Sequence, residues 1–298
     1  MFRPLLAEKL DFKILQYPTL VSPKYDGFRC LINSMGQPVS RNLKPIPNGY
    51  VYTKLEELNL PKLDGELLTY TGDKVDDFNT IQSKLTTRSG RPDFRYMVFD
   101  DWSVPTSPYQ TRNGIVGLWF DQNKHKTKYI EHVIQLHARG EEDVLDFEAK
   151  CLSLGWEGIM ARSYDGHYKF GRSTTKEGIL LKLKRFFDGE AVVLSMHELV
   201  HNANEAVTNE LGYTERSSHK ANMLGMGTLG KFTVKWKDVE FDVGTGFNQQ
   251  QRDTYWKNGC IGETIKFKYQ SLGPNGKPRF PVFLGFRSKA DLDGNIPF

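Results

Sequence analysis

The stretch Ser22-Pro23-Lys24-Tyr25-Asp26-Gly27-Phe28-Arg29 places a lone lysine between a proline and an Asp-Gly pair. Proline and glycine favour a turn that aims one side chain and leaves the backbone open to close approach by a ligand. A lysine amine is a nucleophile only when it is deprotonated, which nearby cations or a desolvated pocket promote. Lys24 is therefore a candidate nucleophile. The same pattern also fits an ordinary exposed turn, so the rest of the chain must decide.

A predicted β-hairpin follows directly after this turn. Residues 27–33 have the composition of a strand, Met35-Gly36-Gln37 is typical of a turn, and residues 39–42 would form the returning strand. We expect this pairing to bring Arg41 close to Arg29.

Two further strands carry single chemically active residues. The apolar segment 62–68 contains Glu66, and the segment 95–100 ends in Phe99 and an aspartate. A carboxylate in such a strand either faces water at a sheet edge or points into the cleft that holds Lys24. An aromatic residue here is either part of the core or a platform for a base.

A glutamate and two lysines come later, again in strands. Glu157 lies near the start of the strand-like segment 156–162. The segment 178–185 alternates apolar with basic residues, so Lys182 and Lys184 share one face of the predicted strand. Two lysines on one face repel each other unless an anion or solvent surrounds them. The segment is therefore either a phosphate site or an exposed edge strand that lysine protects from pairing.

The pattern changes near residues 187–188. Helical spacing is found before this point, at 76–87, 125–139 and 141–154, the last of which is closed by Gly155. Short strand-like segments with turn signals follow it, which favours a small barrel or sandwich. The polar segment 197–230 is interpreted as one long loop, a length that is usually functional or mobile.

The composition is that of a globular protein with two domains. The chain has 298 residues, of which 39% are hydrophobic and 26% charged, and its net charge of +4 is compatible with a polyanionic partner. Cys30, Cys151 and Cys260 are far apart, which argues against a disulfide framework and a cysteine zinc site. Neither a signal peptide nor an apolar run of ~18 residues is present, so we expect a soluble cytoplasmic protein without membrane contact.

These residue types together suit a nucleoside triphosphate. An aromatic face stacks on the base, arginines bind ribose and phosphate, and carboxylates hold a divalent cation such as Mg²⁺. Two lysines stabilise charge that develops at phosphorus. The same cations would favour the neutral, attacking form of the Lys24 amine.

The ordered motifs resemble those of the covalent nucleotidyltransferase superfamily, and specifically the small ATP-dependent DNA ligases of phage type. The run 278–287 also looks like the end of a ligase OB domain. The matching segments are KYDGFR (24–29), SRN (40–42), DGELL (64–68), YMVFD (96–100), EGIMAR (157–162) and LLKLKR (180–185).

This resemblance implies an α+β fold in two domains. Residues 1–187 would form the nucleotidyltransferase (adenylation) domain, with antiparallel sheets and flanking helices, and residues 188–298 an all-β OB-fold barrel. The family joins 5′-phosphate and 3′-hydroxyl ends at nicks in double-stranded DNA, in replication, repair and recombination. AMP from ATP is first carried on the lysine and then on the DNA. We also expect a monomer, located in the host cytoplasm if a phage encodes it.

The resemblance further assigns roles to individual residues. Lys24 would be the nucleophile, assisted at the α-phosphate by Lys182 and Lys184. ATP would be bound by Ser22, Arg29, Arg41, Glu66, Phe99, Glu157, Lys182 and Lys184. Mg²⁺, with Mn²⁺ as a substitute, would be held by Glu157 and Glu66. DNA would be bound by Arg41, Lys266, Lys268, Arg279 and Arg287.

One motif departs from the family pattern. Many members end in R-x-D-K, whereas this chain has Arg287-Ser288-Lys289-Ala290, without the acid and with the lysine shifted. Whether Arg287 or Lys289 contacts the leaving pyrophosphate is therefore open.

Other functions remain as alternatives at this point. An RNA ligase or an mRNA-capping guanylyltransferase of the same superfamily would share most of these motifs. A single-strand-binding OB protein would need stacking aromatics and a basic groove, but it would have no use for Lys24 together with Glu66 and Glu157. An NAD-dependent ligase is disfavoured, because its additional N-terminal domain and four-cysteine zinc module are absent.

Overall fold

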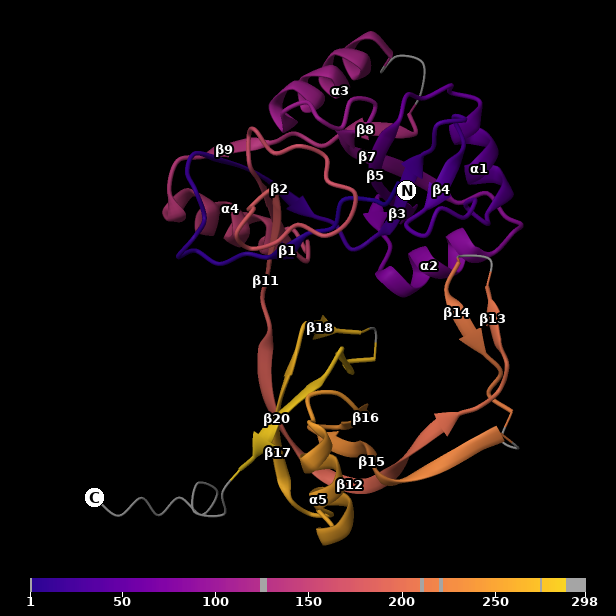
Figure 1. The fold of residues 1–298 in the computed structure, drawn as a ribbon, viewed down its shortest axis with the longest axis vertical. Helices are drawn as coiled ribbons and strands as arrows, with labels where there is room; N and C mark the ends of the chain where they lie inside the picture. The colour runs from indigo at the N-terminus through magenta and orange to yellow at the C-terminus, as the bar shows by residue number, and fades with distance from the viewer. Residues whose placement is uncertain (1, 124–127, 210–211, 220–221, 274, 288–298) are drawn as a thin grey trace. The chain divides into compact units, whose positions relative to one another are not determined.

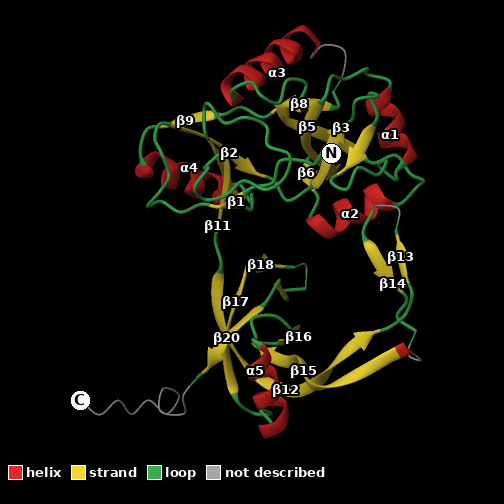
Figure 2. Cartoon of the chain, in the orientation of Figure 1, coloured by secondary structure: helices red, strands yellow, loops and turns green. Residues whose placement is uncertain are grey.

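The chain folds into two compact units, which Figure 1 follows from the N-terminus to the C-terminus. The first contains the residues up to 184 together with 208–214, and the second contains 185–207 and the residues from 215 on. Strands form most of the regular structure of both (Figure 2). The structure, a computed structural model, describes residues 2–123, 128–209, 212–219, 222–273 and 275–287.

One sheet of the first unit carries Lys24. Strand β10 pairs antiparallel with β2 on one side and β11 on the other, so that Gly158 lies opposite both Lys24 and Lys184. This register brings three distant parts of the sequence together beside Glu157. The strands, in sheet order, are β1 (Glu8–Lys9), β11 (Leu180–Lys184), β10 (Gly158–Arg162), β2 (Thr19–Lys24) and β9 (Leu136–Ala138).

Gly158 is required by this arrangement. Its φ of 150° lies in a region that favours glycine, and a Cβ atom would collide with the carbonyl oxygen of Leu183 on β11. The glycine after Glu157 therefore allows β10 and β11 to approach closely.

A second sheet of the first unit carries the arginine, glutamate and aromatic residues singled out above. Strand β3 pairs with both β4 and β5, which places Arg29 opposite Glu66 and Cys30 opposite Ser40. The predicted hairpin is thereby confirmed. The strands, in sheet order, are β4 (Pro38–Ser40), β3 (Phe28–Ile32), β5 (Leu63–Thr71), β7 (Asp93–Asp101) and β8 (Ile130–His132), with β6 (Lys74–Val75) paired to β5.

Polar caps begin two of the helices in this unit. Asn48 accepts a hydrogen bond from the amide of Val51 at the start of α1, and Asp77 accepts two at the start of α2. The predicted helices at 76–87 and 141–154 are confirmed, and Gly155 has φ 82°. The four helices of this unit in the described residues are α1 (Gly49–Glu56), α2 (Phe78–Thr86), α3 (Tyr109–Asn123) and α4 (Glu141–Ser153).

The sheets of the first unit have separate apolar cores. Leu67 on β5 belongs to one cluster with Leu55 and Ile81 from the helices, whereas Ile159 on β10 packs with Val144 of α4 in another. Trp156 packs against both clusters. The residue before Glu157 therefore ties the two sheets together next to the site.

The second unit is built on a five-stranded antiparallel sheet with one helix. Its cluster of buried residues is centred on Phe232, Phe267 and Phe283. The barrel predicted for this unit is not closed: among the described residues the sheet ends at β16 on one side and β20 on the other. The strands, in sheet order, are β16 (Val239–Val243), β15 (Met223–Trp236), β12 (Phe187–Asn202), β17 (Thr264–Tyr269) and β20 (Val282–Phe286), accompanied by α5 (Gln249–Asn258) and the pair β18 (Ser271–Leu272) and β19 (Pro278–Arg279).

The interpretation of residues 197–230 as one long loop is wrong. Strands β12 and β15 run on past the core, as far as Asn202 opposite Met223. Beyond them, β13 (Ala206–Thr208) pairs with β14 (Thr214–Arg216). These strands are largely exposed, so they lack the apolar alternation by which strands are recognised, and backbone pairing alone defines them.

The helix predicted at 125–139 is also wrong. The described part of this segment forms β8 and β9, and residues 125–127 lie outside the described residues. The helix of this region is α3, further upstream, which leaves Ile115 and Leu118 exposed and so has no clear apolar face. No helix in the described part of the chain is long and apolar enough to cross a membrane.

Candidate active site

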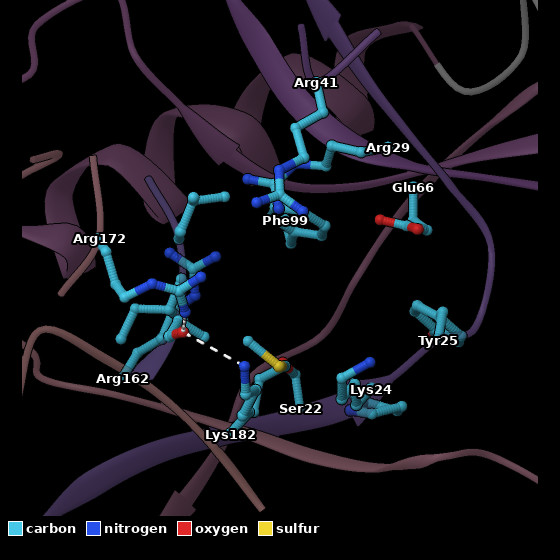
Figure 3. A pocket seen from close by; sticks show the side chains of 15 residues that line it. Ser22, Lys24, Tyr25, Arg29, Arg41, Glu66, Phe99, Arg162, Arg172 and Lys182 are labelled. Atoms are coloured by element: carbon cyan, nitrogen blue, oxygen red, sulfur yellow. Dashed lines mark hydrogen bonds between the residues drawn. The ribbon is translucent and has the colours of Figure 1, made fainter. Parts of the chain in front are cut away.

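Six of the eight residues predicted to bind ATP line a cavity of about 250 Å³ in the first unit, whereas Glu157 and Lys184 are not among its lining residues. Figure 3 shows Lys24, Ser22 and Lys182 along one side and Arg29, Arg41 and Phe99 across from them. Both sheets contribute, because β2, β10 and β11 come from one and β3, β5 and β7 from the other. The lining residues are Leu6, Ala7, Ser22, Pro23, Lys24, Tyr25, Arg29, Arg41, Glu66, Phe99, Met160, Arg162, Arg172, Leu180 and Lys182.

Glu157 holds two of the predicted lysines at once. One carboxylate oxygen is ion-paired with Nζ of Lys24, and the other accepts a hydrogen bond from Nζ of Lys184 at 3.1 Å. The strand register explains this geometry, since Gly158 lies between both lysines and the Glu157 amide donates to the Lys24 carbonyl at 3.2 Å. Burial alone would raise the pKa of Glu157, but Lys24 and Lys184 hold it below its usual value. Glu157 is therefore a carboxylate anion in contact with the candidate nucleophile.

Lys182 lies in a group of cations. It is half-buried, and its Nζ donates to the carbonyl oxygen of Ala7 at 3.5 Å, a bond drawn in Figure 3. Arg172 donates to the same carbonyl at 2.6 Å. Burial, followed by the nearby cations, lowers the pKa of Lys182. A concentration of positive charge within a partly closed cavity is the setting in which a phosphate group binds most strongly.

The guanidinium of Arg29 is held in place by a buried carboxylate. Its Nε and Nη2 donate to the two carboxylate oxygens of Asp64, each at 2.6 Å, and Asp64 is fully buried. Burial opposes the guanidinium charge, but Asp64 outweighs this effect and raises the pKa of Arg29. Arg41, in contrast, is exposed and lies directly beyond the end of β4. The two arginines line one cavity, as the hairpin predicted, but only Arg29 is held rigidly.

Two guanidinium groups lie within cation–π distance of the Phe99 ring. The Cζ atom of Arg29 is 4.8 Å from the centre of the ring and that of Arg162 is 5.3 Å from it. Ser22, which is buried, lines the cavity opposite Met160 in the β2–β10 ladder. These residues give the cavity an aromatic face and a small polar group, which is what a purine base requires.

The pKa of Glu66 is raised in the folded protein. Burial raises its pKa from 4.5 to about 7, although Arg29 and Lys24 oppose the shift. Its ionised form is therefore penalised in the folded protein. A carboxyl group can donate a hydrogen bond to a hydroxyl group when it is protonated and accept one when it is ionised. A group that titrates near neutral pH can therefore do both.

Replacing Glu66 with glutamine is expected to remove a pH dependence of stability. The glutamate ionises freely in the unfolded chain but not in the folded one, so the wild type loses stability as pH rises from 4.5 to about 7. The melting temperature of Glu66→Gln should exceed that of the wild type at about pH 8, and the difference should vanish below about pH 4, where the carboxyl group is protonated in both states. Thermal denaturation across this range measures it. The exposed Glu57→Gln, at the C-cap of α1, is the control, and equal melting curves at about pH 8 would contradict the expectation.

The residues predicted to bind DNA, other than Arg41, lie in the second unit, each with a neighbour. Lys266 is 3.4 Å from a carboxylate oxygen of Asp188, and Nε of Arg287 donates to Glu190 at 2.6 Å. The other two stack on rings, Lys268 on Phe186 at 5.1 Å and Arg279 on Phe280 at 5.4 Å. Lys289 lies outside the described residues.

Two cavity residues were missed in the sequence. Arg162 was quoted as part of EGIMAR without a role, and Arg172 lies in a segment without strand or helix periodicity. The N-terminal carbonyl of Ala7 was missed as well. For Arg172 the only signal available was the basic residue itself, because strand alternation cannot reveal a cation placed by a loop. Arg162, in contrast, is the last residue of β10.

Two family descriptions match the chain. The ATP dependent DNA ligase domain matches residues 4–184, and the DNA ligase OB-like domain matches residues 225–287. The chain belongs to the ATP-dependent DNA ligase family. The resemblance drawn from the motifs is thereby confirmed, as are the predicted fold class and the DNA ligase activity. This ligase uses ATP and acts on DNA.

Known proteins resemble the ligase over nearly its whole length. The DNA ligase of Haemophilus influenzae is 25% identical over 264 residues, which are 89% of this chain and 85% of that protein. A crystal structure of the Chlorella virus DNA ligase-adenylate is 34% identical, covering 97% of this chain and 99% of that one, with a TM-score of 0.56. A Lig E DNA ligase structure has a TM-score of 0.71 at 24% identity over 96% of this chain and 100% of that one, which shows the fold alone.

Proposed function

We propose that this ligase seals nicks in double-stranded DNA between a 5′-phosphate and a 3′-hydroxyl, with AMP carried first on Lys24. The observation that carries the proposal is the position of Lys24. It lies in a cavity with an aromatic face, a rigid arginine and a group of cations, and it contacts the carboxylate of Glu157. This arrangement supplies a nucleophile, a base site and a phosphate site together.

The first step would form the covalent intermediate. Lys24 loses a proton, and Glu157 is the carboxylate in contact with it. The neutral Nζ attacks the α-phosphorus of ATP, so that a nitrogen–phosphorus bond forms while the bond to pyrophosphate breaks. Lys182 and Lys184, on β11 at the far side of β10 from Lys24, would balance the negative charge that develops at phosphorus.

The next two steps would transfer AMP and join the strand. An oxygen of the 5′-phosphate attacks the AMP phosphorus, which breaks the bond to Lys24 and returns the amine. The 3′-hydroxyl then attacks the 5′-phosphorus, loses its proton and releases AMP. Arg41, which is exposed at the rim of the cavity, is suited to hold the 5′-phosphate.

The remaining contacts to the nucleotide follow from the lining residues. Phe99 would stack on the adenine, with Ser22 near its amino group, and Arg29 would reach the ribose or a phosphate. Glu66 suits a ribose hydroxyl better than a metal, because burial favours its neutral form. We assign these roles by the match to the family motifs and by the shared cavity.

Glu157 is the carboxylate whose ionised form best fits a magnesium ion. The described residues include no group of three or more His, Cys, Asp or Glu side chains placed to hold a metal. Mg²⁺ nevertheless commonly uses one or two carboxylates with substrate phosphates and water. Glu157, with Glu66 as a second candidate, would hold it, and when bound it would offset phosphate charge. Mn²⁺ has the same oxygen preference and would serve as a substitute.

DNA would also contact the second unit. Lys266, Lys268, Arg279 and Arg287 are suited to phosphates, which position a duplex without reading its sequence. We propose that residues 1–187 carry the nucleotide chemistry and residues 188–298 the OB-domain contacts to DNA, in a monomer. The three cysteines are free and buried, which is compatible with the proposed cytoplasmic location.

A substrate panel tests this function. We expect ATP to support sealing of a nicked DNA duplex with a 5′-phosphate, and we expect no sealing with NAD⁺, with GTP or after chelation of Mg²⁺. A nick without the 5′-phosphate is the control, since it has no group to accept AMP. A preference for nicked RNA would favour an RNA ligase, and transfer of GMP from GTP would favour a capping enzyme.

A further inference from the structure

A tyrosine outside the six motifs contacts the carboxylate that holds Arg29 in the active-site cavity. Tyr168 is 2% exposed and belongs to the segment between β10 and β11. Its phenol donates a hydrogen bond to Oδ2 of Asp64 at 2.5 Å and accepts one from the amide of Leu5 at 3.3 Å. A buried phenol bonded to a carboxylate is a strong, charge-assisted contact.

The same carboxylate oxygen also holds Arg29. Oδ2 of Asp64 accepts from Nη2 of Arg29 at 2.6 Å, and this Nη2 further donates to the carbonyl of Leu5 at 3.2 Å. Tyr168 and Arg29 therefore share both Asp64 and Leu5 as partners. Among the described residues, Nη1 of Arg29 has no hydrogen-bond partner, and Arg29 lines the cavity. The free end of the guanidinium is thus available to a ligand.

The tyrosine itself is held firmly. Its amide donates to the carbonyl of Pro105 at 2.7 Å, and the guanidinium of Arg112 lies 5.8 Å from the centre of its ring. The ring of Phe2 stacks on that of Tyr168, with the two ring centres 6.4 Å apart. These contacts give the phenol one orientation, so the hydroxyl is a fixed donor.

Arg29 has a second carboxyl group close to it. Glu66 lies directly opposite it in the β3–β5 ladder and lines the same cavity. If Asp64 held the guanidinium less firmly, Arg29 would turn toward Glu66. That movement would occupy both the arginine and the glutamate that we assign to the nucleotide.

We propose that Tyr168 is a positioning residue which, through Asp64, aims the free end of Arg29 at the nucleotide. The inference rests on the proposed function of the cavity. It adds a residue from outside the six motifs, brought to Arg29 by the fold alone. Tyr168 does not touch the substrate; it removes the alternative orientations of a side chain that does.

Single-turnover self-adenylylation of Tyr168→Phe at varied ATP concentration tests the proposal, where KM is the half-saturating ATP concentration and kcat the maximal rate. The variant keeps the ring and loses only the hydroxyl. We expect the KM for ATP to rise roughly three- to tenfold while kcat changes by less than about twofold, since the binding group is mispositioned and the nucleophile is untouched. An unchanged KM would overturn the proposal.

Tyr96→Phe is the matched control. Its hydroxyl is also buried, and it donates to the carbonyl of Cys30 at 3.1 Å rather than to Asp64. Both variants should remain folded, but only Tyr168→Phe should raise the KM. An equal rise in both would mean a general loosening of the core and would overturn the proposal.

A double-mutant cycle then tests whether Tyr168 acts on Arg29 through Asp64. If Tyr168 acts through Asp64, adding Tyr168→Phe to Asp64→Asn should change the KM by less than about twofold, whereas independent effects would multiply. Multiplying effects would overturn the path through Asp64. Should Asp64→Asn fail to fold, the comparison of the two tyrosine variants decides alone. The proposed function is judged separately, because its failure would appear as a wild type that forms no covalent AMP.

Discussion

Replacing Lys24 with arginine is expected to abolish covalent AMP formation while the protein stays folded. Arginine keeps the positive charge and the ion pair with Glu157, but its guanidinium is protonated at every accessible pH and cannot attack phosphorus. Sealing of a nicked duplex should fall by at least ~10³-fold, as is typical when a nucleophile is removed. Quenched-flow assays of the labelled DNA strand measure the rate.

A second substrate separates chemistry from binding in this variant. DNA that already carries AMP at the nick needs no lysine nucleophile, so Lys24→Arg should still join it. Lys54→Arg, at an exposed ion pair on α1, is the control for the substitution itself and should seal at the wild-type rate. Retained sealing of ordinary nicks by Lys24→Arg would mean that another residue carries AMP.

Replacing Asp100 with asparagine is expected to lower the free energy of unfolding by about 3–5 kcal/mol. Asp100 is fully buried and accepts from Nε of Arg112 at 2.9 Å and from Nη1 of Arg162 at 2.6 Å. Both arginines are almost completely buried. Removing the shared anion leaves two uncompensated cations, and breaking a buried pair costs about 3–5 kcal/mol. At roughly 2–4 °C per kcal/mol, the melting temperature should fall by roughly 6–20 °C.

The first residue of the same strand offers a matched control. Asp93 pairs with Arg95 at 2.9 Å, but its side chain is 42% exposed. Asp93→Asn should therefore change the free energy of unfolding by less than about 1 kcal/mol. Calorimetry of the two variants tests the difference. Similar melting temperatures would mean that Asp100 is not the counter-ion of the buried arginines.

The sequence was most informative where a motif residue lies in a strand. Lys24, Glu66 and Phe99 lie in strands and Glu157 lies directly before one, so the local pattern located the strands that carry them but left the direction of each side chain open. Their convergence could not be derived from periodicity, because it depends on strand pairing. It followed from the resemblance to the ligase family.

The failures have a common physical cause, which is dependence on distant contacts. The segment around Ile130–His132 is a strand because it pairs with β7, not because of its own composition. Tyr168 reaches Asp64, and Arg172 reaches Ala7, across more than a hundred residues of sequence. Such contacts leave no local pattern, so only the folded chain reveals them.

The most direct test of the account is to find which residue carries AMP. The wild type is incubated with ATP and Mg²⁺, digested and examined by peptide mass spectrometry, with and without a chase of nicked DNA. The account predicts one AMP on the peptide containing Lys24, lost after the chase with nicked DNA and retained after a chase with intact duplex. AMP on any other residue, or AMP on Lys24 that nicked DNA fails to remove, would contradict it.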